Sequence, residues 1–158
     1  MTALLRIAFF VPATVIVALL STAPAAAQGG NTCTISTTSV AFGTYDVFGS
    51  GDVNSTGSVT INCGSAVRDL TVTLSTGASG TYASRTMVKS GEALAYNLYR
   101  DAACTSVWGD GTAGTQTYFN ADPPNNTNVV LTIYGRIPAL QDVSAGGYSD
   151  TIVATINW

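Results

Sequence analysis

The chain has 158 residues, a formal net charge of −3 and only 9% charged residues. With six basic residues in all and no basic cluster, it is a poor match for nucleic acid or for an anionic membrane surface. Histidine is absent, which excludes Ser-His-Asp and Cys-His catalytic arrangements and the usual ligand sets of catalytic zinc.

The N-terminal segment has the features of a secretory signal peptide. Arg6 supplies a positive charge, an apolar run follows over 7–20, and Ala25-Ala26-Ala27 fits the small-residue rule for cleavage. The run is too short and wrongly flanked for a membrane-spanning helix, so we expect no membrane insertion after cleavage. The sequence therefore predicts a cleaved signal peptide over 1–27 and one domain over 28–158.

The rest of the chain alternates apolar and polar residues with a period of two. Val59, Ile61 and Cys63, for example, share one face of a strand whose other face is polar. The predicted strands cover 32–42, 58–63, 70–75, 82–88, 93–99, 128–137 and 148–158. About seven short strands without a helical period predict an all-β antiparallel sandwich.

The three cysteines are an odd number for an exported protein. Cys33 opens the first predicted strand and Cys63 closes the second, and an oxidising compartment would let them pair. Such a bond would close a loop of about thirty residues and stabilise the fold by about 3–4 kcal/mol. The alternative is that both are small buried hydrophobic residues. Cys104 is left over as a free buried thiol, an intermolecular link or a partner in another pairing.

Catalysis would have to come from carboxylates. Asp101, Asp110, Asp142 and Asp150 could in principle converge as a hydrolytic pair. Aspartates beside glycine are, however, typical of turns, and Gly-Asp-Gly around Asp110 lacks the further acids of a calcium loop. We therefore expect no enzyme, and we predict no catalytic residue, cofactor or metal site.

Aromatic residues offer a second binding chemistry. A sugar-stacking platform could be built from residues with exposed rings, although packing inside the fold is the commoner fate of such residues. The candidates are Tyr96, Tyr99, Trp108, Tyr118 and Phe119.

Several ordered motifs cover nearly all of the predicted domain. They are FGTYD (42–46), LSTGASG (74–80), YNLYRDAA (96–103), VWGDGT (107–112), YGRIPALQ (134–141) and GYSDT (147–151). Together they resemble the signature of the spore coat protein U family, the secreted domain of archaic (Csu-type) chaperone–usher pilus subunits.

The resemblance implies an Ig-like pilin that lacks one strand. A periplasmic pilus chaperone would lend a strand, and the N-terminal extension of another pilus subunit would later replace it at an outer-membrane usher. In physical terms this is strand addition to an unpaired edge and an apolar groove. By analogy, the groove would lie between the first and last predicted strands, with Ile35, Val40, Phe42, Ile152, Ile156 and Trp158.

One feature departs from that pattern. The leader between the predicted cleavage site and Cys33 is Gln-Gly-Gly-Asn-Thr, which is too short and too polar to fill a groove. We therefore expect a subunit that accepts a strand but donates none, as a terminal subunit would, or a family member that works outside a long polymer.

Two functions remain. The first is a structural subunit of a surface pilus or coat, exported to the bacterial periplasm and then to the cell surface or secreted, which serves adhesion and biofilm formation. The second is a stand-alone secreted β-sandwich that binds or hydrolyses carbohydrate.

Overall fold

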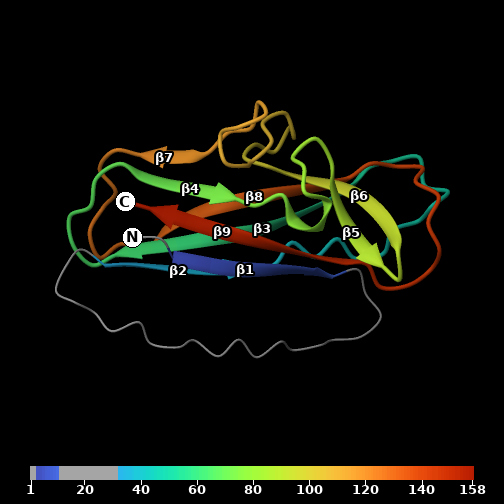
Figure 1. Ribbon diagram of the computed structural model, residues 1–158, viewed down its shortest axis with the longest axis horizontal. Coiled ribbons are helices and arrows are strands. Elements are labelled where there is room, and N and C mark those ends of the chain that lie inside the picture. The colour runs from blue at the N-terminus through green and yellow to red at the C-terminus, as the bar shows by residue number, and fades with distance from the viewer. Residues whose placement is uncertain (1–2, 11–31) are drawn as a thin grey trace.

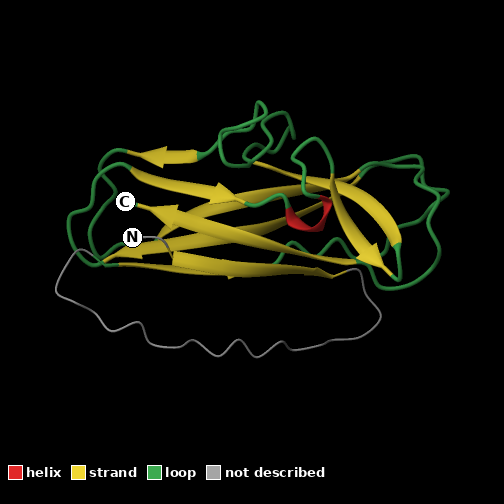
Figure 2. Cartoon of the chain, viewed as in Figure 1, coloured by secondary structure: helices red, strands yellow, loops and turns green. Residues whose placement is uncertain are grey.

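Figure 1 shows the computed structural model, which describes the backbone of residues 3–10 and the whole of residues 32–158. The strands are β1 (Ala3–Phe10), β2 (Cys33–Thr38), β3 (Val53–Cys63), β4 (Leu70–Leu74), β5 (Arg85–Lys89), β6 (Glu92–Tyr99), β7 (Tyr118–Asn120), β8 (Val129–Ile137) and β9 (Ser149–Asn157). One 3-10 turn, η1 (Gly77–Ser79), follows β4 (Figure 2). Within the described residues, no helix has the length and apolar character needed to cross a membrane.

The strands form one antiparallel network with the order β2-β3-β8-β6-β5-β9-β4-β7, and β1 pairs with β9 outside that path. The longest ladder within that path joins β3 to β8, from Val53 opposite Ile137 to Ile61 opposite Val129. β6 pairs with β8 at one end and with β5 at the other, so it carries the network from one layer to the next. The result is a sandwich in which β2, β3 and β8 lie in one layer and β4 and β9 in the other (Figure 1).

The core lies between these two layers because alternate residues of the facing strands are buried. Val59 and Ile61 of β3 belong to the same buried apolar cluster as Ile152 and Ile156 of β9. Trp108 is the largest fully buried side chain among the described residues, and its indole Nε1 donates a hydrogen bond to the carbonyl oxygen of Val72 at 3.1 Å. That bond removes the cost of burying the only polar atom of the indole ring.

The predicted all-β, Ig-like antiparallel sandwich is confirmed, and individual strands differ from the prediction in their bounds. β2 ends at Thr38, although Val40 and Phe42 beyond it are buried as the alternation indicates. β3 begins at Val53, ahead of the predicted start, because its polar first half is held by pairing with β8 and has no apolar period of its own. β7 has three residues, too few for a period of two to be recognised.

The cysteines pair as the strand positions indicate. Cys33 and Cys63 lie opposite each other in the β2–β3 ladder and form a disulfide bond, which confirms the predicted pairing. Cys104 is a free, half-buried cysteine in the loop after β6, and burial raises the pKa of its thiol. It is therefore bonded to neither of the other two.

The predicted cleavage site after Ala27 and the start of the leader lie outside the described residues. The signal peptide over 1–27 and the domain boundary at Gln28 therefore stay predictions. Part of the predicted signal peptide is nevertheless described, because residues 3–10 form β1.

Candidate strand-acceptor edge

The folded domain pairs with β9 along one of its two edges. β4 pairs with its C-terminal half, from Leu74 opposite Ala154 to Thr71 opposite Asn157. Ser75, the residue after β4, continues this pairing toward the N-terminal half of β9. Its amide donates a hydrogen bond to the carbonyl oxygen of Val153, and its Oγ accepts one from the amide of Val153, both at 2.9 Å. One edge of β9 is thus closed by residues of the folded domain.

The other edge of β9 pairs with β1 along 149–156, and we call this side the acceptor edge. The ladder is antiparallel and uninterrupted, from Ala3 opposite Ile156 to Phe10 opposite Ser149. In Figure 1 β1 (blue) runs along β9 (red) on the side where β2 also lies. β2 pairs with β3 alone, so no ladder of the described residues links β2 to β9.

Asp150 anchors the start of β9. Its side chain is 5% exposed. Its Oδ1 accepts hydrogen bonds from the amide of Ala78 at 2.9 Å and from the amide of Thr151 at 2.7 Å. Its Oδ2 accepts a hydrogen bond from the Tyr96 hydroxyl at 2.7 Å. Gly77 has φ +68°, and a Cβ there would lie 2.1 Å from the Asp150 Oδ2 atom, so the η1 turn can approach the carboxylate only with glycine at that position. Burial, with Asp150 as the next cause, raises the pKa of Tyr96 far above its usual range, so the hydroxyl is a donor at all ordinary pH values.

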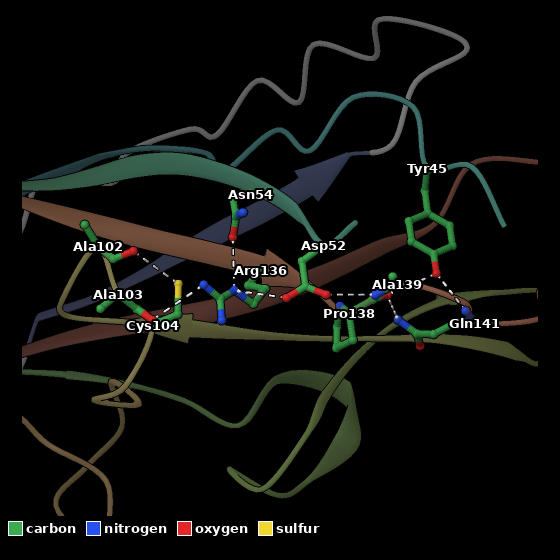
Figure 3. Close-up of polar contacts among 10 residues, drawn as sticks. All are labelled: Tyr45, Asp52, Asn54, Ala102, Ala103, Cys104, Arg136, Pro138, Ala139 and Gln141. Atoms are coloured by element: carbon green, nitrogen blue, oxygen red, sulfur yellow. Dashed lines mark hydrogen bonds and ion pairs between the residues drawn. The ribbon is translucent and has the colours of Figure 1, made fainter. Parts of the chain in front are cut away.

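The loop between β8 and β9 follows Ile137, which lies opposite Val53 at the other end of β3 from Cys63. Hydrogen bonds fix this loop in place (Figure 3). The Tyr45 hydroxyl donates to the carbonyl oxygen of Pro138 at 3.0 Å and accepts from the amide of Gln141 at 2.7 Å. The amide nitrogen of Ala139 donates to Asp52 Oδ1 at 3.0 Å. These bonds tie the loop that enters β9 to the connection between β2 and β3.

Arg136 closes the same network from β8. Its Nε donates to Asn54 Oδ1 at 3.1 Å and lies 3.6 Å from Asp52 Oδ2, and its Nη2 reaches the carbonyl oxygen of Ala103 at 3.5 Å (Figure 3). Gln141 reaches across to β6, where its Oε1 accepts from the amide of Ala95 at 2.7 Å and its Nε2 donates to the Ala95 carbonyl at 2.9 Å. FGTYD, YGRIPALQ and the loop after YNLY, far apart in the sequence, thus meet at one end of the fold.

The predicted groove residues lie on β2 and β9 or just beyond the ends of these strands. Ile152 and Ile156 are fully buried in β9, and Val40 and Phe42 are buried just beyond β2. Ile35 and Trp158 are half-buried and pack against the core. The structure brings all six into one apolar cluster; that they line a groove for a partner's strand stays a prediction.

Arg85 is a central residue that sequence reasoning missed. It is fully buried on β5, and its guanidinium donates to the carbonyl oxygens of Ser75 and Trp108 and to Asn97 Oδ1 at 2.6–3.0 Å. Burial lowers its pKa. In the sequence, Arg85 is a single arginine within a weakly apolar predicted strand. That pattern does not reveal its hydrogen-bond partners, which lie 10–23 positions away.

Three of the four candidate carboxylates, Asp101, Asp110 and Asp150, each accept hydrogen bonds from a different set of groups. Asp101 accepts from the backbone of Thr105 and Ser106, and these bonds lower its pKa; Asp110 accepts from Thr112 with the same effect. Asp150 is used in the anchor described above. Among the described residues, no three acidic or cysteine side chains come together closely enough to hold a metal ion.

The aromatic candidates do not share one exposed face. Tyr96 and Trp108 are 1% exposed, Tyr99 and Tyr118 are half-buried, and only Phe119 is largely exposed. The Arg100 guanidinium lies 5.7 Å from the centroid of the Tyr118 ring and 6.0 Å from that of Trp108, so a cation–π contact already uses these rings. The pocket beside them has a volume of about 240 Å³, below the usual range for ligand sites.

Comparison with known proteins identifies the family. The profile of the Spore Coat Protein U domain matches residues 19–155. "Protein U" of Myxococcus xanthus is 32% identical over 130 residues, which cover 74% of this chain and 70% of that protein.

A solved structure gives the same fold. The chaperone–tip adhesion subunit pre-assembly complex (CsuC–CsuE) of archaic chaperone-usher Csu pili from Acinetobacter baumannii is similar, with a TM-score of 0.57 and 24% identity. The match covers 81% of this chain but only 40% of that one, so this chain spans about two fifths of its length. With the profile matching most of the chain and Protein U sharing about a third of its residues, the chain belongs to the spore coat protein U domain family.

Proposed function

We propose that this protein is a structural subunit of a secreted surface pilus or coat that is assembled by donor-strand complementation and serves adhesion and biofilm formation. Its partners would be a periplasmic pilus chaperone, an outer-membrane usher and other subunits. The solved structure with the same fold is that of a tip subunit with its chaperone, which supports partners of this kind.

The acceptor edge of β9 is the observation that carries the proposal. The strand that covers it comes from residues 3–10, which the sequence predicts to be removed with the signal peptide. A domain without these residues would present, on one edge of β9, the unpaired amides and carbonyls of alternate residues along 149–156, beside a buried apolar cluster. Unpaired edges of this length bind extended segments readily, because each backbone group gains a partner.

Chemistry elsewhere in the chain supports export. The Cys33–Cys63 bond requires an oxidising compartment to form and persist, such as the bacterial periplasm or the cell surface. The disulfide bond joins the first residue of the edge strand β2 to β3. A strand inserted between β2 and β9 would therefore have a covalently fixed strand on one side.

The test is production of residues 28–158 in a bacterial periplasm, with and without the cognate chaperone. We expect the protein alone to aggregate or be degraded, because its β9 edge and the apolar residues beside it are exposed, and we expect the chaperone to restore soluble protein. Co-purification with an affinity-tagged chaperone measures the complex. A Cys104→Ala variant is the matched control, since this cysteine lies in a loop after β6, and it should behave like the parent chain.

A folded, soluble monomer that neither needs nor binds the chaperone would overturn the proposal. That outcome would favour the stand-alone, carbohydrate-directed alternative. For the described residues, the burial of Tyr96 and Trp108 and the stacking of Arg100 leave little aromatic surface for that alternative.

A further inference from the structure

The acceptor edge is covered by the chain's own N-terminal segment over its whole length. β1 pairs with β9 at eight consecutive positions, whereas β4 pairs with β9 at four and β5 at one. The ladder of β1 is therefore the longest that β9 makes.

The register matches the burial pattern of β9. Four apolar residues of β1 lie opposite the four buried positions of β9 in this ladder, and the charged residue Arg6 lies opposite the half-buried Val153. The matched pairs are Ala3–Ile156, Leu5–Ala154, Ile7–Ile152 and Phe9–Asp150. A shift of one residue would place Arg6 opposite a buried position, so the pairing has one favoured register.

The connection between β1 and β2 is long enough for β1 to pair with β9 of the same chain. The 22 residues of 11–32 between β1 and β2 span at most about 70 Å when extended, whereas an eight-residue strand is about 26 Å long. Two segments joined by a chain of this length have an effective concentration of order millimolar. A strand from a partner at micromolar concentration would therefore compete poorly with β1.

We propose that Ala3–Phe10 caps the acceptor edge of its own precursor, so that removal of this segment is the step that opens β9 to a partner's strand. The inference rests on the proposed function and adds its regulation. Cleavage after Ala27 would remove all eight paired residues at once and leave the polar leader Gln-Gly-Gly-Asn-Thr, which has no alternating apolar side chains to replace them. The uncleaved chain would be a folded monomer that does not assemble.

The experiment compares the full chain 1–158 with the mature chain 28–158, both refolded under oxidising conditions with the probe present, because the mature chain alone is expected to aggregate. The probe is a fluorescein-labelled synthetic peptide with the sequence ALLRIAFF of β1, and binding is followed by fluorescence anisotropy. We expect saturable binding to the mature chain and binding at least about tenfold weaker to the full chain, whose edge is filled in cis. Light scattering after gel filtration should show the full chain as a monomer.

A double substitution reopens the edge without shortening the chain. In an antiparallel ladder, one of any two consecutive amides points to a given neighbour, so Arg6→Pro with Ile7→Pro must remove a donor to β9. This variant of the full chain should bind the peptide as the mature chain does. Arg6→Lys with Ile7→Val is the matched control, because it keeps both amides, and it should stay closed.

The outcomes separate the two proposals. Any of three results would overturn self-capping and leave the proposed function standing. They are equal peptide binding by the full and mature chains, an unfolded full chain, and a full chain that forms swapped multimers. A mature chain that melts at the same temperature as the full chain and binds no peptide would overturn both. A mature chain that is unfolded and not rescued by peptide, beside a folded full chain, supports capping in cis.

Discussion

Asp150 and Arg85 show how single buried charges organise this fold. Each is at most 5% exposed, and each is surrounded by hydrogen-bond partners from segments distant in the sequence. Among the described residues, every buried polar side-chain atom has a partner. Replacing such a residue therefore leaves several unpaired groups, which costs more than the bond that is lost.

Asp150→Ala should be strongly destabilising for this reason. The amides of Ala78 and Thr151 and the hydroxyl of Tyr96 would lose their acceptor, and we expect the free energy of unfolding to fall by about 3 kcal/mol. Tyr96→Phe removes one donor and should cost about 1 kcal/mol. Urea unfolding of the full chain, followed by tryptophan fluorescence, measures both values. A loss below that of Tyr96→Phe would contradict the anchoring role of the carboxylate.

Glu92 should make stability depend on pH at the acid end. Its carboxylate accepts hydrogen bonds from Ser144 Oγ at 2.6 Å, from the Tyr148 hydroxyl and from the Ser144 amide, and these bonds lower its pKa from 4.5 to about 2. A lowered pKa in the folded state stabilises the fold above pH 4.5, and this stabilisation is lost as the pH falls from 4.5 to 2.

The measurement is the urea midpoint between pH 6 and pH 2. The parent chain should lose stability steadily below pH 4.5, and Glu92→Gln, which cannot titrate, should show a shallower decline. Asp101 and Asp110 also have lowered pKa values and account for the decline that remains in the variant. Identical pH profiles for both proteins would contradict the assignment to Glu92.

At the scale of elements, β2 and β8 are held by different means. β2 has a ladder on one side only and is fastened by the disulfide at its first residue. β8 is paired on both sides, and the segment after β2 crosses it closely at Gly135, where a Cβ would lie 2.6 Å from Val40 Cγ1 and 2.7 Å from Phe42 Cζ.

Replacing Cys33 and Cys63 together by alanine should lower the free energy of unfolding by about 3–4 kcal/mol, because the closed loop of about thirty residues is released in the unfolded chain. Cys104→Ala is the matched control and should cost less than about 1 kcal/mol, since that thiol is half-buried and unbonded. Peptide mapping without reduction should recover the Cys33–Cys63 link. A Cys63–Cys104 link would contradict the observed pairing.

Gly135→Ala should destabilise the domain by about 1–3 kcal/mol, because the added methyl group would force Val40 and Phe42 out of their packed positions. Gly51→Ala is the control: it adds the same group where no atom lies within 4 Å. Thermal melting of both variants gives the comparison. Equal melting temperatures would show that the close approach at Gly135 relaxes without loss.

On the scale of the whole molecule, acceptance and donation of a strand are separate properties. In the proposed function, β9 supplies the edge for acceptance, and the segment that pairs with this edge is 3–10, ahead of the predicted cleavage site. The leader that follows the site spans at most about 17 Å and is polar or glycine throughout. The mature chain would thus receive a strand without passing one on.

The chaperone-bound mature protein, offered to itself, should therefore form no ladder of SDS-resistant, non-covalent multimers. Each apolar side chain of a donor strand contributes about 1.5–3 kcal/mol when fully buried, and the leader has none to contribute. A chain that carries ALLRIAFF ahead of Gln28 is the positive control and should pair with the next copy, because a leader of about 17 Å is too short to run back along an eight-residue strand of about 26 Å. Self-polymers of the unaltered mature protein would show that the leader does donate.

The sequence by itself determined which side of each regular strand is buried. Val59, Ile61 and Cys63 alternate with polar residues, and all three are buried as that period indicates, because a pleated strand sends successive side chains to opposite faces. The disulfide prediction used the same positions, since cysteines at the ends of two predicted strands, in a chain with a predicted signal peptide, favour pairing. These properties are local, and a period of two is a local signal.

Only the tertiary structure decided which edge of β9 pairs with β1 and which partners the buried Arg85 and Asp150 side chains have. The pairing of β1 with β9 joins residues about 140–150 positions apart. The hydrogen bonds that Arg85 donates to Ser75, Asn97 and Trp108 form only when the three segments that carry these residues are in place. β7 and the first half of β3 are strands because of their neighbours rather than their own alternation. Strand order and long-range hydrogen bonds depend on the whole chain, and no short window of sequence contains them.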